Sequence, residues 1–348
     1  MVKLVISSLR KDAGKTAMAL GIANESKMKI GYMKPLGDRL LYRKKRLWDF
    51  DSAIFTNLFT IDELPEDMSI GFDHSKLRYM YDADSCQKRL LEMAESTGRG
   101  KELLLVETSQ DLTRGISVHL DTFSICRAIE GRLLVVANGN NDEIVDDLVF
   151  MKQRLNLEGI NLAGVIINKV TDLEEFNSVH MNYLQELDLN ILGVMPFERE
   201  LTFPTVKFIA DILFARVLTG NESLGRIVKE IFVGAMSADA VLRMEKFTKT
   251  GKLIITGGDR SDMLLAAIDT DCVAVVLTNN VLPPPNIIAM AAEKNVPLLL
   301  TQGDTYETAK KIDQMVPLLS HTDTDKIEKI KSTFSENING EALAKLLR

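Results

Sequence analysis

The sequence predicts an α/β protein with mostly parallel sheets covered by helices, divided into two domains. The chain has 348 residues, and at roughly 150 residues per domain this length indicates about two domains. Short apolar runs alternate with helical patterns, which favours parallel sheets with crossover helices. Most of the runs lack a polar/apolar alternation, so we expect strands that are covered on both faces.

The predicted elements form two series along the chain. In the first series the expected strands cover residues 3–6, 29–33, 102–106, 133–137, 163–167 and 191–194. The second series has strands at 252–256, 272–277 and 297–300, with helices at 262–268 and 286–293. A turn-rich stretch separates the two series. We therefore predict a first domain at 1–217, a linker at 218–223, a smaller α/β domain at 224–335 and a C-terminal helix or tail at 336–348.

Composition narrows the kinds of partner. The net charge is −7, from 42 basic and 49 acidic residues, which argues against a nucleic-acid-binding surface. No window approaches 18 apolar residues, so we expect no membrane span. Cys86, Cys126 and Cys272 are widely spaced and form no CxxC motif, which indicates a reducing compartment. We expect a cytoplasmic protein that binds small molecules.

The segment after the first predicted strand indicates a phosphate-binding loop. A small polar loop leads into Gly14-Lys15-Thr16, and a helical pattern follows, which is the context of a Walker A motif. Backbone N–H groups at the helix start would bind phosphate oxygens, Lys15 would reach the β- and γ-phosphates, and Thr16 would ligate Mg²⁺. The strict motif has glycine where Leu9 stands, and the alternative is a chance Gly-Lys-Thr in a βα turn. The nucleotide-binding candidates in this loop are Ser8, Arg10, Lys11, Asp12, Ala13, Gly14, Lys15 and Thr16.

A second lysine ends the next predicted strand. Lys34 precedes Pro35, and a lysine at the carboxyl end of a parallel strand points toward the ligand crevice. Taken alone, Lys34 is equally consistent with a solvated loop residue.

Together these segments resemble a known family. The phosphate loop, followed by residues 31–35, 104–107, 164–169, 192–196 and 203–205, resembles dethiobiotin synthetase. The match is closer to the dethiobiotin-synthetase-like N-terminal region of long phosphotransacetylases, in which a DRTGG domain follows. The turn made by Gly257, Gly258, Asp259 and Arg260 is similar to the turn of that domain. The resemblance covers nearly the whole chain and implies a P-loop NTPase followed by a smaller α/β DRTGG domain.

The resemblance also implies roles for individual residues. It implies ATP and Mg²⁺ as cofactors and a catalytic role for Lys15 and Lys34. It assigns recognition of the base to Asn168 and Lys169, and the residues after them favour ATP over GTP. Besides Thr16, the implied Mg²⁺ ligands are Glu107, which follows an apolar strand, and Asp51.

Each carboxylate has a plain structural alternative. Glu107 could cap a helix or lie exposed. Asp51 opens a predicted helix and could be its N-cap, in which case Asp49 is the alternative ligand. Asp12 could also approach the metal ion.

Two segments are candidates for binding a second ligand. Residues 39–46 contain five basic residues in an acidic chain. Such a run is usually a solvated face, but Arg39 and Arg43 could clamp an anion. Ser109, Thr113 and Arg114 follow Glu107, where dethiobiotin synthetase has a glycine-rich substrate loop. This departure makes carboxylation of a biotin precursor doubtful.

These features support three functions. The first is a nucleotide-dependent regulatory or sensor protein, in which the DRTGG domain adds a second ligand site or, as the resemblance implies, a homodimer interface. The Gly257–Arg260 turn could equally be an ordinary βα turn. The alternative is a ligase-like enzyme that phosphorylates a carboxylate or carbamate, and the third is a scaffold with a vestigial loop. Acetyl transfer to phosphate is not expected, because in the resembling proteins the acyltransferase domain follows the DRTGG region.

Overall fold

The computed structural model describes residues 1–348 except 44–45, 60, 235, 245–246, 248–249 and 316, and residues 41–43 and 46 by their backbone alone. The described chain forms two compact units. Unit 1 comprises residues 1–198 and 319–348, and unit 2 comprises residues 199–318. Each has its own sheet with helices on both faces, which confirms the predicted α/β class with mostly parallel sheets.

The sheet of unit 1 has six parallel strands in the order β2-β5-β1-β6-β7-β8. All six were predicted at nearly these positions. Their bounds are β1 Val2–Ser8, β2 Ile30–Met33, β5 Leu103–Glu107, β6 Arg132–Ala137, β7 Asn161–Val170 and β8 Ile191–Pro196. A separate antiparallel hairpin pairs β3 (Leu40–Arg43) with β4 (Arg46–Asp49), and this hairpin was not predicted.

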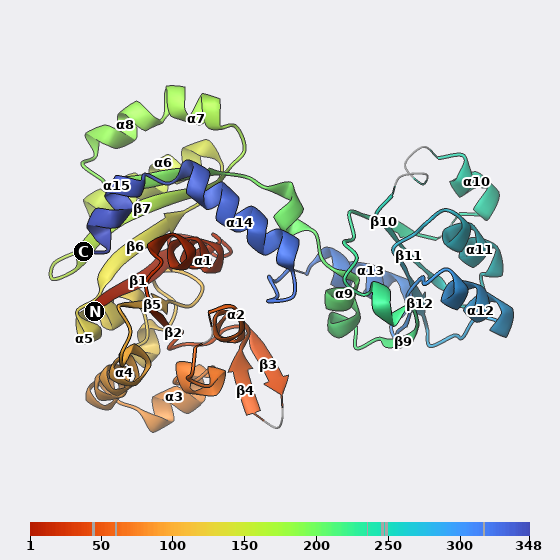
Figure 1. Ribbon diagram of the computed structural model, residues 1–348, viewed down its shortest axis with the longest axis horizontal. Coiled ribbons are helices and arrows are strands. Elements are labelled where there is room, and N and C mark those ends of the chain that lie inside the picture. The colour runs from red at the N-terminus through yellow and green to blue at the C-terminus, as the bar shows by residue number, and fades with distance from the viewer. Residues whose placement is uncertain (44–45, 60, 235, 245–246, 248–249, 316) are drawn as a thin grey trace. The chain divides into compact units, whose positions relative to one another are not determined.

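Helices cover both faces of this sheet. One face packs on α4 (Ala83–Gly98), α5 (Thr122–Ile129), α6 (Asn141–Arg154), α7 (Leu173–Val179) and α8 (Met181–Glu186). On the other face α1 (Lys15–Ser26) lies beside α14 (Thr324–Asn337), as Figure 1 shows. The smaller helices of this unit are α2 (Phe50–Leu58), α3 (His74–Met80) and α15 (Gly340–Leu346).

Unit 2 contains five strands in the order β10-β11-β12-β13-β9, of which only β9 is antiparallel. The strand bounds are β9 Arg216–Thr219, β10 Glu230–Val233, β11 Lys252–Gly257, β12 Ala274–Thr278 and β13 Leu298–Leu300. On one face lie α10 (Ala238–Leu242), α11 (Ser261–Asp269) and α12 (Pro285–Glu293), and on the other α9 (Val206–Ile212) and α13 (Thr305–Asp313). The predicted strands at 252–256, 272–277 and 297–300 correspond to β11, β12 and β13.

The boundaries between the two units lie at residues 198/199 and 318/319 and not at the predicted linker 218–223. Residues 199–217 belong to unit 2, because Val206 and Ile209 enter its core and β9 pairs with β13. Residues 319–348 belong to unit 1, where the buried Phe334 ring packs against Gly21 of α1. The chain therefore leaves unit 1, forms unit 2, and returns to complete unit 1. Among the described helices, none is long and apolar enough to cross a membrane.

Candidate functional site

The strand register of unit 1 brings several predicted site residues to one edge of the sheet. Strand β1 runs between β5 and β6, and Ile6 pairs with Glu107. Strand β2 pairs with β5 on its other side, so Met33 lies next to Val106. The carboxyl ends of β1, β2 and β5 therefore meet, which is where open parallel sheets bind ligands.

The loop between β1 and α1 has the backbone form of a phosphate loop. Gly14 is the N-cap of α1 and has a left-handed backbone (φ 88°). A Cβ atom at this position would lie 2.4 Å from the Asn168 amide nitrogen, so glycine is required both by its φ angle and by the available space. No side chain caps α1 through a hydrogen bond, which leaves its first N–H groups in the arrangement that binds anions.

Lys15 and Thr16 connect this loop to the neighbouring strand. The Lys15 ammonium donates to Ser8 Oγ at 3.1 Å and to the carbonyl oxygen of Gln110 at 2.8 Å. The Thr16 hydroxyl donates to Glu107 Oε1 at 3.0 Å. Burial lowers the pKa of Lys15, and this effect outweighs the opposing effect of Glu107. The hydrogen bond from Thr16 shows that the Glu107 carboxylate points at the start of α1.

Glu107 is itself held from the side opposite Thr16. The Tyr32 hydroxyl donates to Glu107 Oε2 at 3.0 Å, and the Tyr32 ring stacks on Phe55 at 4.0 Å between centroids. Both Tyr32 and Glu107 are buried. Burial, followed by the charge of Asp51, raises the pKa of Glu107. Tyr32 was not among the predicted site residues.

Lys34 lies among four carboxylates. Its ammonium is 2.6 Å from Asp38 Oδ1 and 2.6 Å from Asp51 Oδ2, and it is 3.8 Å from both Asp49 Oδ1 and Glu107 Oε1. Lys34 is 1% exposed. Burial alone would lower the pKa of Lys34, but Asp51, Asp49 and Glu107 together raise it well above its usual value. Lys34 is therefore a buried, charged residue of the site rather than a solvated loop lysine.

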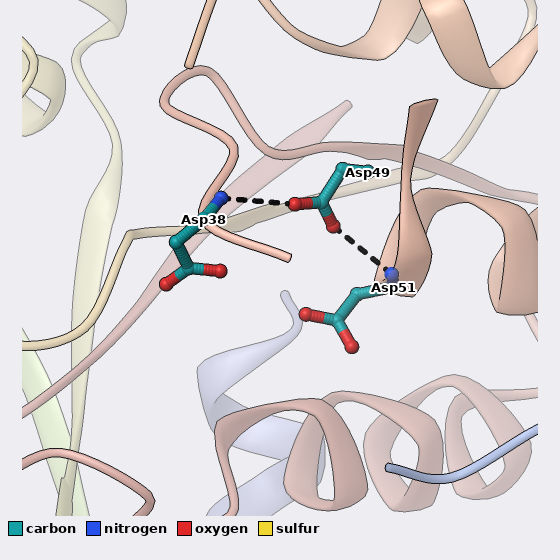
Figure 2. A group of neighbouring side chains, drawn as sticks. All are labelled: Asp38, Asp49 and Asp51. Carbon is teal, nitrogen blue, oxygen red and sulfur yellow. Dashed lines mark hydrogen bonds between the residues drawn. The ribbon is translucent and has the colours of Figure 1, made fainter. Parts of the chain in front are cut away.

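The aspartates have roles that differ from those expected. Asp49, not Asp51, is the N-cap of α2, and its carboxylate accepts hydrogen bonds from the backbone N–H groups of Asp38 and Asp51 (Figure 2). Asp51 is thereby left to face Lys34, and Lys34 and Arg39 hold its pKa below the usual value despite the opposing effect of burial. One carboxylate oxygen from each of Asp38, Asp49 and Asp51 lies within 4.8 Å of the others.

The remaining loop candidates are placed differently. Arg10 turns away from the loop and pairs at 2.6 Å with both Glu143 and Asp147 of α6. Lys11 and Asp12 are exposed, and Ala13 is buried. The two base-recognition candidates hold the loop from outside: Asn168 Nδ2 donates to the Ala13 carbonyl at 2.8 Å, and Lys169 Nζ donates to the Asp12 carbonyl at 2.6 Å.

The second-ligand candidates do not all reach the site. Arg39 does, since its guanidinium lies 3.2 Å from Asp12 and 3.6 Å from Asp51. Ser109 does as well, because its hydroxyl donates to Asp38 Oδ2 at 3.1 Å. Thr113 and Arg114 are exposed and are held in a turn by Asp111. The side chain of Arg43 and all of residues 44–45 lie outside the described residues.

The predicted turn of unit 2 follows β11. A Cβ atom at Gly258 would lie 1.9 Å from the Val281 carbonyl oxygen, so this position requires glycine for close packing. Arg260 donates to the carbonyl oxygens of Gly234 and Met236 and pairs with Asp262 at 3.2 Å. Gly257 ends the strand, and Asp259 is exposed. Arg260 therefore links this turn to the segment that follows β10.

Two site residues were missed by the sequence reasoning. Asp38 lies four residues after Lys34 in the loop that leaves β2, and its four-residue spacing from that lysine was the available signal. Tyr32 alternates with Met33 on β2, and Met33 is packed in the opposite core. The period of a strand therefore placed Tyr32 on the same face as α1.

Comparison with known proteins gives a consistent family. The chain is 26% identical over 365 residues to a phosphate acetyltransferase of Synechocystis sp., covering 99% of this chain and 52% of that protein. It is 22% identical over 369 residues to the phosphate acetyltransferase of Deinococcus radiodurans, covering 100% of this chain and 51% of that protein. The chain thus spans about half the length of these relatives. The resemblance to phosphotransacetylases is confirmed.

Solved structures give weaker likenesses. One is the structure of the CBS and DRTGG domains of the regulatory region of Clostridium perfringens pyrophosphatase in complex with diadenosine tetraphosphate. Its TM-score is 0.30 and its sequence identity is 18%, and the match covers 46% of this chain and 82% of that chain.

Two family models match the sequence. Residues 208–315 match the DRTGG domain model. Residues 2–205, more than half of the chain, match the AAA domain model. The chain therefore belongs to this AAA domain family and carries a DRTGG domain after it.

Proposed function

We propose that the protein is a Mg·ATP-binding regulatory or sensor protein whose AAA domain binds the nucleotide at the edge of the unit 1 sheet. The observation that carries this proposal is the contact network among Thr16, Lys34, Asp51 and Glu107, together with the buried Lys15, whose pKa is lowered by burial and affected in the opposite direction by the charge of Glu107. These residues come from two strand ends and two helices, and all five are buried.

The oxygen groups in the cluster fit a magnesium ion. Mg²⁺ prefers carboxylate and hydroxyl oxygens, and Thr16, Asp51 and Glu107 supply such oxygens. When bound, Mg²⁺ would supply charge neutralisation on the phosphate oxygens. Asp49 is the least suited of the acids, because its two oxygens already accept backbone hydrogen bonds.

The cations of the site have complementary tasks. Lys15 is buried with its ammonium on neutral oxygens of Ser8 and Gln110, so it would gain stabilisation from a phosphate group. Lys34 and Arg39 would neutralise further negative charge. Asn168 and Lys169 would keep the loop in shape through the carbonyl groups of Ala13 and Asp12, in addition to the base-recognition role that we propose for them.

The regulatory part of the proposal is supported by the DRTGG domain. The relatives that match the whole chain are phosphate acetyltransferases about twice its length, and we propose that nucleotide occupancy of unit 1 is the regulatory signal. The alternative is a ligase-like enzyme that phosphorylates a carboxylate or carbamate. The position of Lys34 favours this alternative. Its ammonium lies 3.8 Å from Glu107 Oε1, where it could neutralise negative charge on a phosphoryl group during transfer.

One experiment tests the proposal. Thermal unfolding of the wild type and of Lys15→Ala is followed with Mg·ATP, Mg·GTP and ADP, together with phosphate release. We expect stabilisation by Mg·ATP that exceeds that by Mg·GTP and that is lost in Lys15→Ala. Absence of stabilisation by all three nucleotides would leave only a scaffold role. Turnover stimulated by a carboxylate and an amine would favour the ligase.

A further inference from the structure

The Lys34 ammonium contacts the carboxylate oxygens that the proposed site would offer to Mg²⁺. It lies 2.6 Å from Asp51 Oδ2 and 3.8 Å from Glu107 Oε1. Glu107 Oε1 is also the oxygen that accepts the hydrogen bond from Thr16, whereas Glu107 Oε2 accepts one from Tyr32. The Glu107 oxygen that faces Thr16 therefore faces Lys34 as well.

The same ammonium holds the group of aspartates drawn in Figure 2. Asp38, Asp49 and Asp51 each offer a carboxylate oxygen within 4.8 Å of the others, an arrangement that could hold a metal ion. The Lys34 ammonium lies 2.6 Å from Asp38 Oδ1 and 3.8 Å from Asp49 Oδ1, in addition to its contact with Asp51. A metal ion bound among these aspartates would thus also compete with Lys34.

Burial makes it costly for two cations to share these oxygens. Mg²⁺ binds oxygen ligands at short distances and gives up its own water reluctantly. Like charges repel strongly where water is scarce, and Lys34, Asp51 and Glu107 are 1%, 2% and 2% exposed. Magnesium alone would therefore have to displace an ammonium that already compensates the carboxylates.

A phosphate group changes this balance, because it offers the ammonium another anionic partner. The Glu107 oxygen near Lys34 also accepts a hydrogen bond from Thr16, which lies in the first turn of α1. Phosphate groups are expected to bind at this helix start. Since the lysine side chain has a flexible stem, its ammonium can turn toward a phosphate group without a change in the backbone.

We propose that Lys34 is a built-in cation that keeps Mg²⁺ off Asp51 and Glu107 until a phosphate group of the nucleotide draws the ammonium away. This inference rests on the proposed nucleotide site and adds a rule for its binding steps: free Mg²⁺ is excluded, whereas Mg²⁺ and nucleotide bind together. A sensor built in this way responds to Mg·ATP and not to changes in the concentration of free Mg²⁺.

The test uses the full chain with three substitutions. Lys34→Met removes the charge, and Lys34→Arg keeps it. Lys152→Met is the matched surface control, because the Lys152 side chain is 37% exposed and pairs with Asp188. Binding of Mg²⁺ alone, of ATP in the presence of EDTA and of Mg·ATP is measured by isothermal titration calorimetry.

The expected effects of Lys34→Met on metal binding and on nucleotide binding have opposite signs. Without nucleotide, Lys34→Met should bind Mg²⁺ roughly 10- to 100-fold more tightly than the wild type, which is the usual range of coupling between two ligands. In EDTA it should bind ATP more weakly than the wild type, because the phosphate groups lose a cationic partner. Lys34→Arg and Lys152→Met should bind Mg²⁺ alone as weakly as the wild type does. A variant that was merely destabilised would lose both kinds of binding.

The wild type provides a second test that does not depend on the folding of Lys34→Met. The ammonium resonance of Lys34 is followed by nuclear magnetic resonance and is identified by its loss in Lys34→Arg. ATP in EDTA should shift this resonance, because the ammonium changes its partner, whereas Mg²⁺ alone should leave it in place.

Two results would overturn the inference. One is a wild type that binds Mg²⁺ alone as tightly as Lys34→Met does, and the other is a Lys34 resonance that shifts with Mg²⁺ alone or stays in place with ATP. Either can occur with normal Mg·ATP stabilisation of the wild type. Absence of that stabilisation would instead contradict the proposed nucleotide site, so the two failures are distinguishable.

Discussion

Replacing Lys34 by methionine tests whether its ammonium is the internal counter-ion of the carboxylate cluster. The substitution keeps much of the side-chain volume and removes the charge. Two carboxylate oxygens then lose a partner at 2.6 Å, and two more lose one at 3.8 Å. Because the surrounding acids are mostly buried, little water can replace the ammonium.

The expected cost follows from this burial. Removing one member of a buried ion pair costs about 3–5 kcal/mol, because the other member is left uncompensated. In a unit of this size, each kcal/mol corresponds to a shift in melting temperature of about 2–4 °C. We therefore expect unit 1 of Lys34→Met to melt roughly 6–20 °C below the wild type.

The assay is thermal unfolding without nucleotide, in the absence and presence of Mg²⁺. The control is Lys152→Met in α6, where the lysine side chain is 37% exposed and pairs with Asp188, and a change within about 0.5 kcal/mol is expected there. Mg²⁺ should stabilise Lys34→Met more than the wild type, because the ion replaces the lost positive charge. Equal melting temperatures of Lys34→Met and Lys152→Met would refute the counter-ion role.

Three further predictions concern unit 1 and the thiols. Tyr32→Phe removes one hydrogen bond to the buried Glu107 carboxylate and should lower the free energy of unfolding by about 2 kcal/mol in a denaturant titration; an unchanged value would mean that Tyr32 does not hold Glu107. Phe334→Ala should lower the free energy of unfolding by about 3–5 kcal/mol, because it empties a buried site. The control Phe150→Ala, at a 56% exposed position, should leave the free energy of unfolding nearly unchanged. All cysteines are buried and free, and burial raises their pKa, so iodoacetamide should label them slowly until the protein is unfolded, and rapid labelling of native protein would contradict the burial. Burial raises the pKa of Cys86 to about 11 and the pKa values of Cys126 and Cys272 to about 12.

The long parallel strands could be predicted because their residues are apolar on both faces. Strands β5 and β6 consist almost entirely of buried aliphatic residues, and β1 contains a buried aliphatic run at residues 4–6. Such runs are recognisable without any partner. Strands β9 and β10 have four residues each and are half-exposed, so their pattern does not differ from that of a loop. They form strands because each pairs with its neighbour at one edge of the unit 2 sheet, β10 with β11 and β9 with β13.

The return of residues 319–348 to unit 1 could not be predicted from local pattern. Helix α14 is amphipathic, and its apolar residues would suit the surface of either unit. Its position is decided by Phe334, which fills the space that Gly21 leaves on α1, and by Asn339, whose N–H binds the Leu192 carbonyl at the edge of β8 at 2.7 Å. Both contacts join residues far apart in the sequence, and neither follows from periodicity or turn chemistry.

The position of Glu107, by contrast, could have been derived more fully from the sequence. In β5, Leu104 and Val106 lie in the core beneath α4 and α5, so Leu103, Leu105 and Glu107 must face the opposite side. That side is covered by α1, which begins with Lys15 and Thr16. A register shifted by one residue would direct Glu107 into the apolar core, where an unpaired carboxylate is strongly unfavourable. The same alternation that builds the sheet therefore directs this carboxylate to the phosphate loop. The identity of its remaining neighbours depends on the 34–51 segment, whose loops and hairpin have no such period.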